Sequence, residues 1–294
     1  MARWTEQRQL QGPRWRDVTS SSRGTSSAKL SRAPRKSDLP AHDVKNFRRI
    51  LKSVLNETDD QGRIWASSQW GVYAFYDYDG EPIYVGQTNE KLAVRVRRHL
   101  TNQRTDAVAM RVLDVMEVAE LEIWPLWELG SLARQGKEQF AEAKILLNAY
   151  ERSAYLQAIE NSRFKAILNE KIPSPSPTVE LPPSLRRPLI DDDTRLVQGH
   201  PDVRVARRAE TISRLADVVR ERGEVSDGLR RVLVIQAIRL AYLTAERLAF
   251  VEGRPMPDPA AIDADELIGS VLAETPGTTE EDIEEDQLDE GSVD

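Results

Sequence analysis

Apolar residues recur every three or four positions along several stretches of the chain, and this spacing places them on one face of a helix. In the first stretch Phe47, Leu51 and Val54 follow this spacing, and Gly62 lies beyond its end. The pattern predicts helices over residues 42–56, 90–100, 137–168, 202–222 and 226–253, and a further apolar-periodic stretch covers 107–116. The helix over 226–253 is apolar around much of its circumference, so it needs a partner surface.

Two strands are predicted between the first two helices. Residues 70–88 (WGVYAFYDYDGEPIYVGQT) are rich in β-branched and aromatic residues on both sides of Asp79-Gly80. An Asp-Gly pair between two such runs is typical of a hairpin turn. Residues 119–126 (AELEIWPL) predict a third strand.

Prolines recur between residues 173 and 201, and proline cannot donate a hydrogen bond to a helix or a sheet, so this segment predicts a domain boundary. On this basis the chain divides into a disordered arm (1–40), an N-terminal helix with its connector (41–68), a central domain (69–172), a proline-rich linker (173–201), a helical hairpin (202–254) and a disordered tail (255–294). The hairpin is too small to bury a core alone. We expect it to pack on the central domain, to self-associate or to bind a protein partner.

The net charge of −7 conceals two oppositely charged parts of the chain. Residues 255–294 contain 14 Asp and Glu and no Lys or Arg, so residues 1–254 carry a net charge of +7. The first 40 residues contain nine Lys and Arg against three Asp and Glu, with Trp4 and Trp15 between them. A basic body is typical of proteins that bind nucleic acid, and the acidic tail could mimic DNA and hold the basic arm or the active site shut.

Composition excludes several other classes of protein. The chain has no cysteine, which removes disulfides, thiolate metal sites and cysteine nucleophiles. With three histidines, a zinc site built from several of them is not expected. No apolar run is long enough to cross a bilayer, and the N-terminus lacks the apolar core of a secretory signal. We therefore expect a soluble, cytoplasmic protein without a membrane span.

Chemistry-bearing residues gather around the predicted hairpin. Gly71-Val72-Tyr73 lies on its first strand and Tyr84-Val85-Gly86 on its second, with ten residues between the two tripeptides. Arg95 follows nine residues after Gly86, and His99 lies one helical turn further on. Residues four apart share a helix face, so these two side chains can point to one place beside the tyrosines.

These motifs resemble the GIY-YIG nuclease family over about residues 69–172. The resemblance rests on the two tripeptides, their spacing, the arginine and histidine of the following helix, and a later helix with a glutamate and a terminal asparagine. It implies an α+β fold, with a small three-stranded antiparallel sheet flanked by helices. It also implies cleavage of DNA phosphodiester bonds that depends on a divalent metal ion.

The resemblance assigns a role to each matching residue. Tyr73 and Tyr84 would position and activate the attacking water, and His99 would accept a proton or polarise a tyrosine that does. Gly86 would leave room for the DNA backbone. Arg95 would neutralise charge on the phosphate, a task that suits a planar and permanently charged group.

The metal ligand implied by the family is one glutamate on a helix, which would hold Mg²⁺ or Mn²⁺ together with water. Glu151 lies off the main apolar stripe of its predicted helix and is the preferred candidate. Glu160 is the main alternative, and Glu142 is a third.

Two further residues are expected to bind the substrate. Asn169 matches the family asparagine by its place after an apolar helix end, although the usual nearby proline is missing. Arg98 lies in the same predicted helix as Arg95.

We therefore expect a metal-dependent DNA endonuclease. The alternatives are a catalytically inactive nucleic-acid-binding module with the same fold, and a protein-interaction factor that uses the helices of residues 202–254.

Overall fold

The computed structural model describes residues 41–101 and 112–272 of the 294-residue chain. The predicted basic arm, the first half of the apolar stretch 107–116 and the end of the predicted acidic tail lie outside the described residues.

The described residues contain one antiparallel sheet of four strands, which adopt the order β2-β1-β3-β4. The strands are β1 (Gly71–Tyr76), β2 (Pro82–Thr88), β3 (Glu120–Pro125) and β4 (Leu185–Pro188). The predicted α+β fold class, with a small antiparallel sheet flanked by helices, is confirmed. The structure adds a fourth strand to the three that were expected, and this strand comes from the segment that was expected to be a linker.

The five expected helices are present, and the described residues also contain three short helices that were not expected: one before residue 137, one in the expected linker and one in the expected tail. The helices are α1 (His42–Val54), α2 (Leu92–Thr101), α4 (Trp127–Ala133), α5 (Lys137–Asn161), α6 (Asp192–Gln198), α7 (Pro201–Arg222), α8 (Asp227–Glu252) and α9 (Ala264–Ile268), with 3-10 turns η2 (Trp65–Ser67), η3 (Val115–Glu117) and η4 (Pro259–Ala261). The α5 helix ends at Asn161, seven residues before its predicted end at 168. Beyond it, Ser162 donates a hydrogen bond to the buried Glu81 at 2.6 Å, which draws the chain away from the helix axis and back to the sheet.

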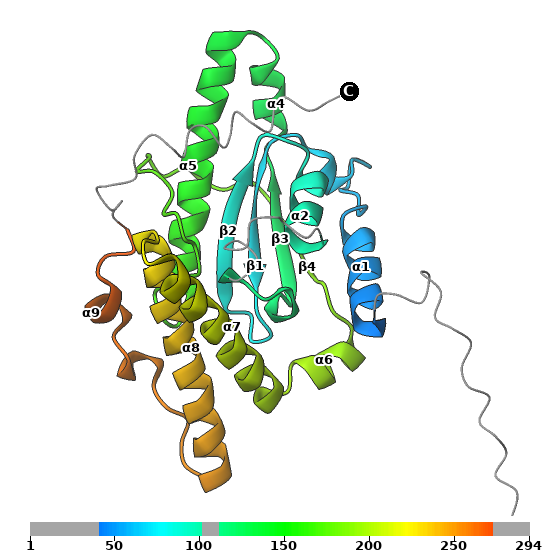
Figure 1. Cartoon of the computed structure of the whole chain (residues 1–294). Coiled ribbons are helices and arrows are strands. Elements are labelled where there is room, and N and C mark those ends of the chain that lie inside the picture. The colour runs from blue at the N-terminus through cyan, green and yellow to red at the C-terminus, as the bar shows by residue number, and fades with distance from the viewer. Residues whose placement is uncertain (1–40, 102–111, 273–294) are drawn as a thin grey trace, which may run out of the picture. The chain divides into compact units, whose positions relative to one another are not determined.

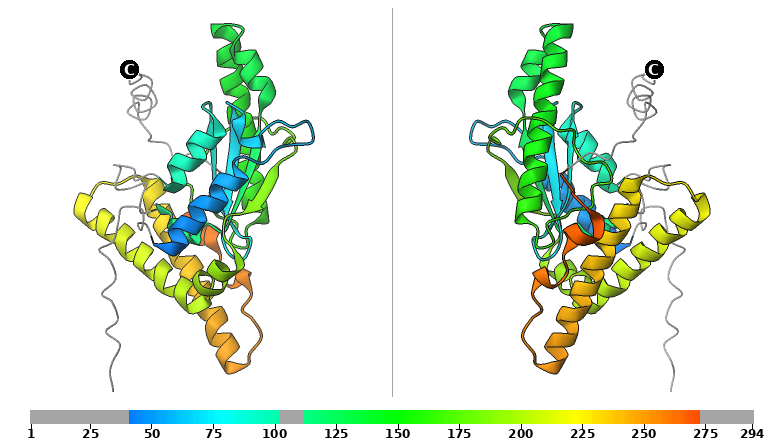
Figure 2. Two further views of the ribbon diagram at one scale, coloured as in Figure 1. Left: turned by 90° about the vertical axis from the view of Figure 1, so that its right-hand side faces the viewer. Right: turned by 90° about the vertical axis from the view of Figure 1, so that its left-hand side faces the viewer.

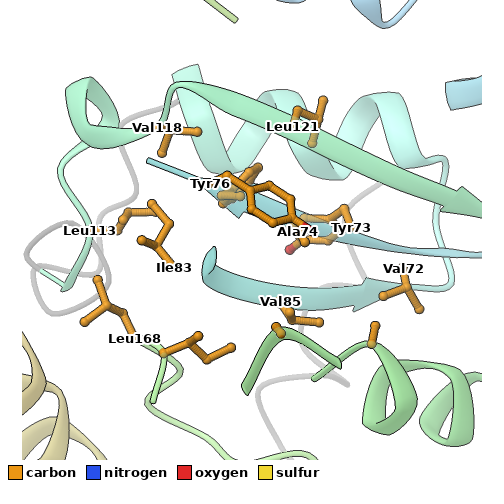
Figure 3. Close-up of a cluster of buried hydrophobic side chains, with 14 of the residues drawn as sticks. Val72, Tyr73, Ala74, Tyr76, Ile83, Val85, Leu113, Val118, Leu121 and Leu168 are labelled. Atoms are coloured by element: carbon orange, nitrogen blue, oxygen red, sulfur yellow. The ribbon is translucent and has the colours of Figure 1, made fainter. Parts of the chain in front are cut away.

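The sheet lies between two helical layers, with α5 on one face and α1 and α2 on the other (Figures 1 and 2). All six residues of β1 are buried, as expected for a central strand that is covered on both faces. Figure 3 shows part of the core, where Ile83 of β2 lies beside Leu113.

The helical hairpin α7–α8 packs on the turn that joins β1 to β2, and charged side chains make much of this contact. Three arginines of the hairpin donate to the buried carboxylate of Asp77, namely Arg204 at 3.1 Å, Arg208 at 3.0 Å and Arg239 at 2.7 Å. Each of these arginines is at most 4% exposed. The hairpin is thus joined to the sheet, and self-association or a protein partner through residues 202–254 stays a prediction.

Among the described residues, no helix combines the length and the apolar character that a membrane crossing requires.

Candidate active site

The register of the β hairpin sets the position of both tyrosines. Tyr73 lies opposite Gly86, and Phe75 lies opposite Tyr84. Because side chains alternate between the faces of a strand, these four positions share one face of the sheet. The rings of Tyr73 and Tyr84 lie 6.2 Å apart between centroids on that face.

Gly86 leaves space that the ring of Tyr73 fills. A β-carbon on Gly86 would lie 2.6 Å from the phenol oxygen of Tyr73 and 3.0 Å from the ring of Tyr84. The resemblance assigned the open space at this glycine to the DNA backbone. The geometry gives the glycine another role, because the phenol occupies the space directly above it.

The α2 helix brings His99 to the same face of the sheet. The Nδ1 atom of His99 lies 3.3 Å from the phenol oxygen of Tyr73. The ring of His99 meets the ring of Tyr84 edge-on, with 4.9 Å between centroids. The imidazole therefore contacts both tyrosines.

Arg95 lies one turn before His99 on α2, and its guanidinium interacts with the same tyrosines. Burial lowers the pKa of Arg95, but the charge and hydrogen bond of Tyr73, followed by the charges of Tyr84 and Glu90, outweigh burial and raise that pKa. The guanidinium is therefore permanently charged. Its Nε atom is buried without a hydrogen-bond partner among the described residues.

Glu151 reaches this group from α5. Burial raises the pKa of Glu151 to about 7, while the charges of Lys171 and Arg95 act to lower it. The carboxylate therefore lies close enough to Arg95 to interact with its charge.

The two alternative glutamates lie on the surface. Glu142 is exposed, and the exposed Glu160 lines a separate open cleft with Glu122 and Trp124. The charge of Glu151 interacts with Arg95, and the choice among the three glutamates as metal ligand stays a prediction.

The possible metal ligand Glu151 suits a hard cation whose other ligands are mainly water molecules. Among the described residues, no group of three or more His, Cys, Asp or Glu could enclose a metal ion. One turn before Glu151, Asn148 accepts a hydrogen bond from Gln87 at 2.9 Å, and the Oε1 atom of Gln87 is buried without a partner in the described part of the chain. One carboxylate can hold Mg²⁺ or Mn²⁺ where water supplies most of the other ligands.

Asn169 lies beneath the site and holds a strand in place. Its side chain is 5% exposed, its Oδ1 atom accepts from the Val85 amide at 3.0 Å, and its Nδ2 atom donates to the Val85 carbonyl at 2.7 Å. Val85 lies between Tyr84 and Gly86, so Asn169 fixes the backbone that carries both.

Arg98 is engaged in an ion pair. Its Nη2 atom donates to Glu90 at 2.5 Å, and both side chains are partly exposed. A substrate-binding role for Arg98 and for Asn169 stays a prediction.

Sequence reasoning missed two neighbours of the site. Phe75 stacks on Tyr84 at 5.8 Å between centroids and meets His99 edge-on at 5.3 Å. Its place two residues after Tyr73 could have revealed this, because alternate residues of a strand share a face. Lys171 follows the end of α5 by ten residues, and no pattern in the sequence connects it with Glu151.

Comparison with known proteins identifies the domain that holds this site. The family model of the GIY-YIG catalytic domain matches residues 69–142. This match includes both tyrosines, Gly86, Arg95 and His99, and it ends before Glu151 and Asn169. Comparisons with curated proteins and with solved structures gave no match. The chain therefore carries the GIY-YIG catalytic domain of a nuclease family.

Proposed function

We propose that the protein is a DNA endonuclease that hydrolyses phosphodiester bonds and depends on a divalent metal ion. The observation that carries this proposal is the convergence of two groups, an imidazole and a guanidinium, on one phenol. The oxygen of Tyr73 lies 3.3 Å from the imidazole of His99 and interacts with the guanidinium of Arg95. The net charge of +7 over residues 1–254 supports a polyanionic substrate.

The tyrosines and His99 supply the path for a proton. A phenol oxygen can accept a proton from the attacking water only if its own proton has another place to go. A neutral His99, in contact with the phenol of Tyr73, can accept that proton. The positive charge of Arg95 beside the phenol stabilises the negative charge that develops on the oxygen.

Arg95 also faces the charge that builds on the phosphate. Hydrolysis adds negative charge to the phosphoryl oxygens, and a planar guanidinium can donate to two of them at once.

Glu151 would hold Mg²⁺ or Mn²⁺ next to Arg95. A bound metal ion supplies Lewis-acid stabilisation of the charge on the leaving oxygen. The carboxylate is partly buried and its pKa is raised to about 7, so a bound cation would compensate the negative charge that partial burial disfavours.

A plasmid-nicking assay tests this proposal. We expect the wild type to nick supercoiled plasmid with Mg²⁺ and not with a chelator. Arg95→Ala and Tyr73→Phe should each lower the rate by about 10² to 10⁴, because each removes one catalytic group.

The matched controls are Arg134→Ala at the exposed end of α4, and Tyr76→Phe, whose hydroxyl contacts Glu122 on the other face of β1. Both should nick at the wild-type rate. Binding of DNA without any cut, with or without metal, would instead support the inactive nucleic-acid-binding module.

A further inference from the structure

A row of positive charges runs along α1, a helix that precedes the matched domain. Lys45, Arg48, Arg49 and Lys52 occupy positions i, i+3, i+4 and i+7, and all four are exposed. Such positions lie on one face of a helix. The opposite face packs into the core through buried apolar residues, Phe47, Leu51 and Val54. We call the four exposed cations the basic stripe.

The basic stripe lies beside the helix that carries the candidate site. The Nη2 atom of Arg48 contacts the carbonyl oxygen of Thr101 at 3.5 Å, and Thr101 follows His99 by two residues at the end of α2. The two helices cover the same face of the sheet (Figures 1 and 2). A polyanion that reaches the site can therefore lie across α1 as well.

The charges in the C-terminal half of the stripe are not used in internal ion pairs. Within the described ranges, no carboxylate lies within ion-pair distance of Arg48, Arg49 or Lys52. Within α1 itself, the one acidic residue is Asp43 in the first turn, so the C-terminal half of the helix carries positive charge alone.

We propose that the basic stripe binds the sugar–phosphate backbone of duplex DNA next to the bond that is cut. This inference rests on the proposed function, and it assigns part of the substrate surface to a helix outside the matched domain. Duplex DNA carries about one negative charge per 1.7 Å of its axis, which suits cations repeated along a helix. No Phe, Tyr or Trp of α1 or α2 is exposed. The surface can therefore contact phosphates, but it offers no ring on which unpaired bases could stack.

The test compares two triple variants of the full-length chain. The first is Arg48→Gln, Arg49→Gln and Lys52→Gln. The control is Arg214→Gln, Arg220→Gln and Arg222→Gln, which removes the same charge from the exposed side of α7. Binding to a labelled duplex is measured by fluorescence anisotropy in a chelator, so that no cleavage occurs, from about 50 to about 300 mM salt.

We expect the slope of the logarithm of the binding constant against the logarithm of the salt concentration to fall by about 3 for the α1 variant, one for each lost phosphate contact. The slope should not change for the α7 variant. A variant with Arg48→Lys and Arg49→Lys keeps the charges and should keep the wild-type slope, which separates loss of charge from any effect on folding.

An unchanged slope for the α1 variant, in a chain that still binds and nicks duplex DNA, would overturn this inference and leave the proposed function standing. The inference would also be overturned if the α1 variant lowered the salt slope for single-stranded DNA and left the slope for duplex DNA unchanged. Tighter duplex binding by the α1 variant would mean that the stripe holds the acidic C-terminal residues instead. A wild type that neither binds nor nicks duplex DNA would refute the proposed function itself.

Discussion

The phenol of Tyr73 fits in its place because Gly86, which lies opposite it on the next strand, has no side chain. The ring is fully buried, and it lies over Gly86 at a distance that only a hydrogen atom on the α-carbon permits. The same ring contacts Phe75 and His99 at its sides. A ring enclosed in this way has no alternative position, so the place of its oxygen is fixed before any substrate binds.

Gly86→Ala should therefore disturb the site more than the fold. The added methyl group would overlap the phenol of Tyr73, and we expect a loss of about 1–3 kcal/mol in the free energy of unfolding. We expect a larger effect on the nicking rate, because the phenol must move away from His99. The measurements are thermal unfolding and single-turnover nicking.

The control is Gly130→Ala in α4, where a β-carbon would make an ordinary contact of 3.5 Å with Trp70. Wild-type nicking by the Gly86 variant would mean that the position of the Tyr73 phenol does not limit the reaction.

The parts of the site that lie close together in the chain could be predicted from the sequence. The spacing of Tyr73 and Tyr84 fixes their register across a short turn, and Arg95 and His99 share a helix face by local geometry. Glu151 could not be separated from Glu160 and Glu142 in this way. All three lie on one long helix, and only tertiary packing determines which of them comes near Arg95.

At the scale of elements, the strand β2 is held along its outer edge by the segment that follows α5. The Leu168 amide donates to the Ile83 carbonyl at 2.8 Å, and Asn169 bonds both polar groups of Val85. This segment thus supplies hydrogen bonds that a neighbouring strand would otherwise make. It keeps Tyr84 and Gly86 in register with β1.

Asn169→Ala should release this edge. The buried amide and carbonyl of Val85 would lose their partners, and we expect a loss of about 1–3 kcal/mol in the free energy of unfolding. The nicking rate should fall while the affinity for duplex DNA stays unchanged. Asn161→Ala, at the exposed end of α5, is the control and should match the wild type in all three measurements.

The opposite result is equally informative. Unchanged stability with weaker DNA binding would show that Asn169 contacts the substrate, as the resemblance to the family implied.

The strand β4 shows where patterns along the sequence fail for an element. It has four residues, LRRP, of which only Leu185 is buried. A short strand that ends in proline and exposes three residues shows no alternation of apolar and polar positions. Its pairing with β3 is decided by tertiary contacts, such as the bond from Arg186 to Glu120 at 2.8 Å.

At the scale of the whole molecule, the contact between the helical hairpin and the sheet centres on one carboxylate. Burial alone would raise the pKa of Asp77, but the charges of three buried arginines, with Arg239 first, outweigh burial and hold that pKa below its usual value of 3.8. The partners of Asp77 lie more than 120 residues away in the sequence. No local pattern predicts such pairs, which is why the sequence left open what the hairpin packs against.

Asp77→Asn should destabilise the protein by about 3–5 kcal/mol near neutral pH, because three buried guanidinium groups would each lose a carboxylate partner. Arg204 would keep Glu117 and Asp79, and Arg208 would keep Glu117. The pH dependence follows from the lowered pKa in the folded state. The stabilisation by Asp77 is complete above pH 4 or so, and it is lost as the pH falls further and the carboxylate becomes protonated. The Asn variant should lack this part of the acid dependence in denaturant unfolding.

Asp217→Asn, which removes an exposed partner of Arg220, is the control and should change the free energy of unfolding by less than about 0.5 kcal/mol. Equal stability of the Asp77 variant and the wild type would mean that the cluster contributes nothing net to folding.

The anchoring of the β1–β2 turn has a consequence for engineering. In most hairpins the connecting residues tolerate exchange and insertion, and a small sheet can be transplanted with them. Here the ten residues between Tyr73 and Tyr84 include Asp77, whose counter-charges come from the far end of the chain. A chimera that received only the matched domain would contain Asp77 without the three arginines that pair with it. Any useful graft must bring α7 and α8 as well.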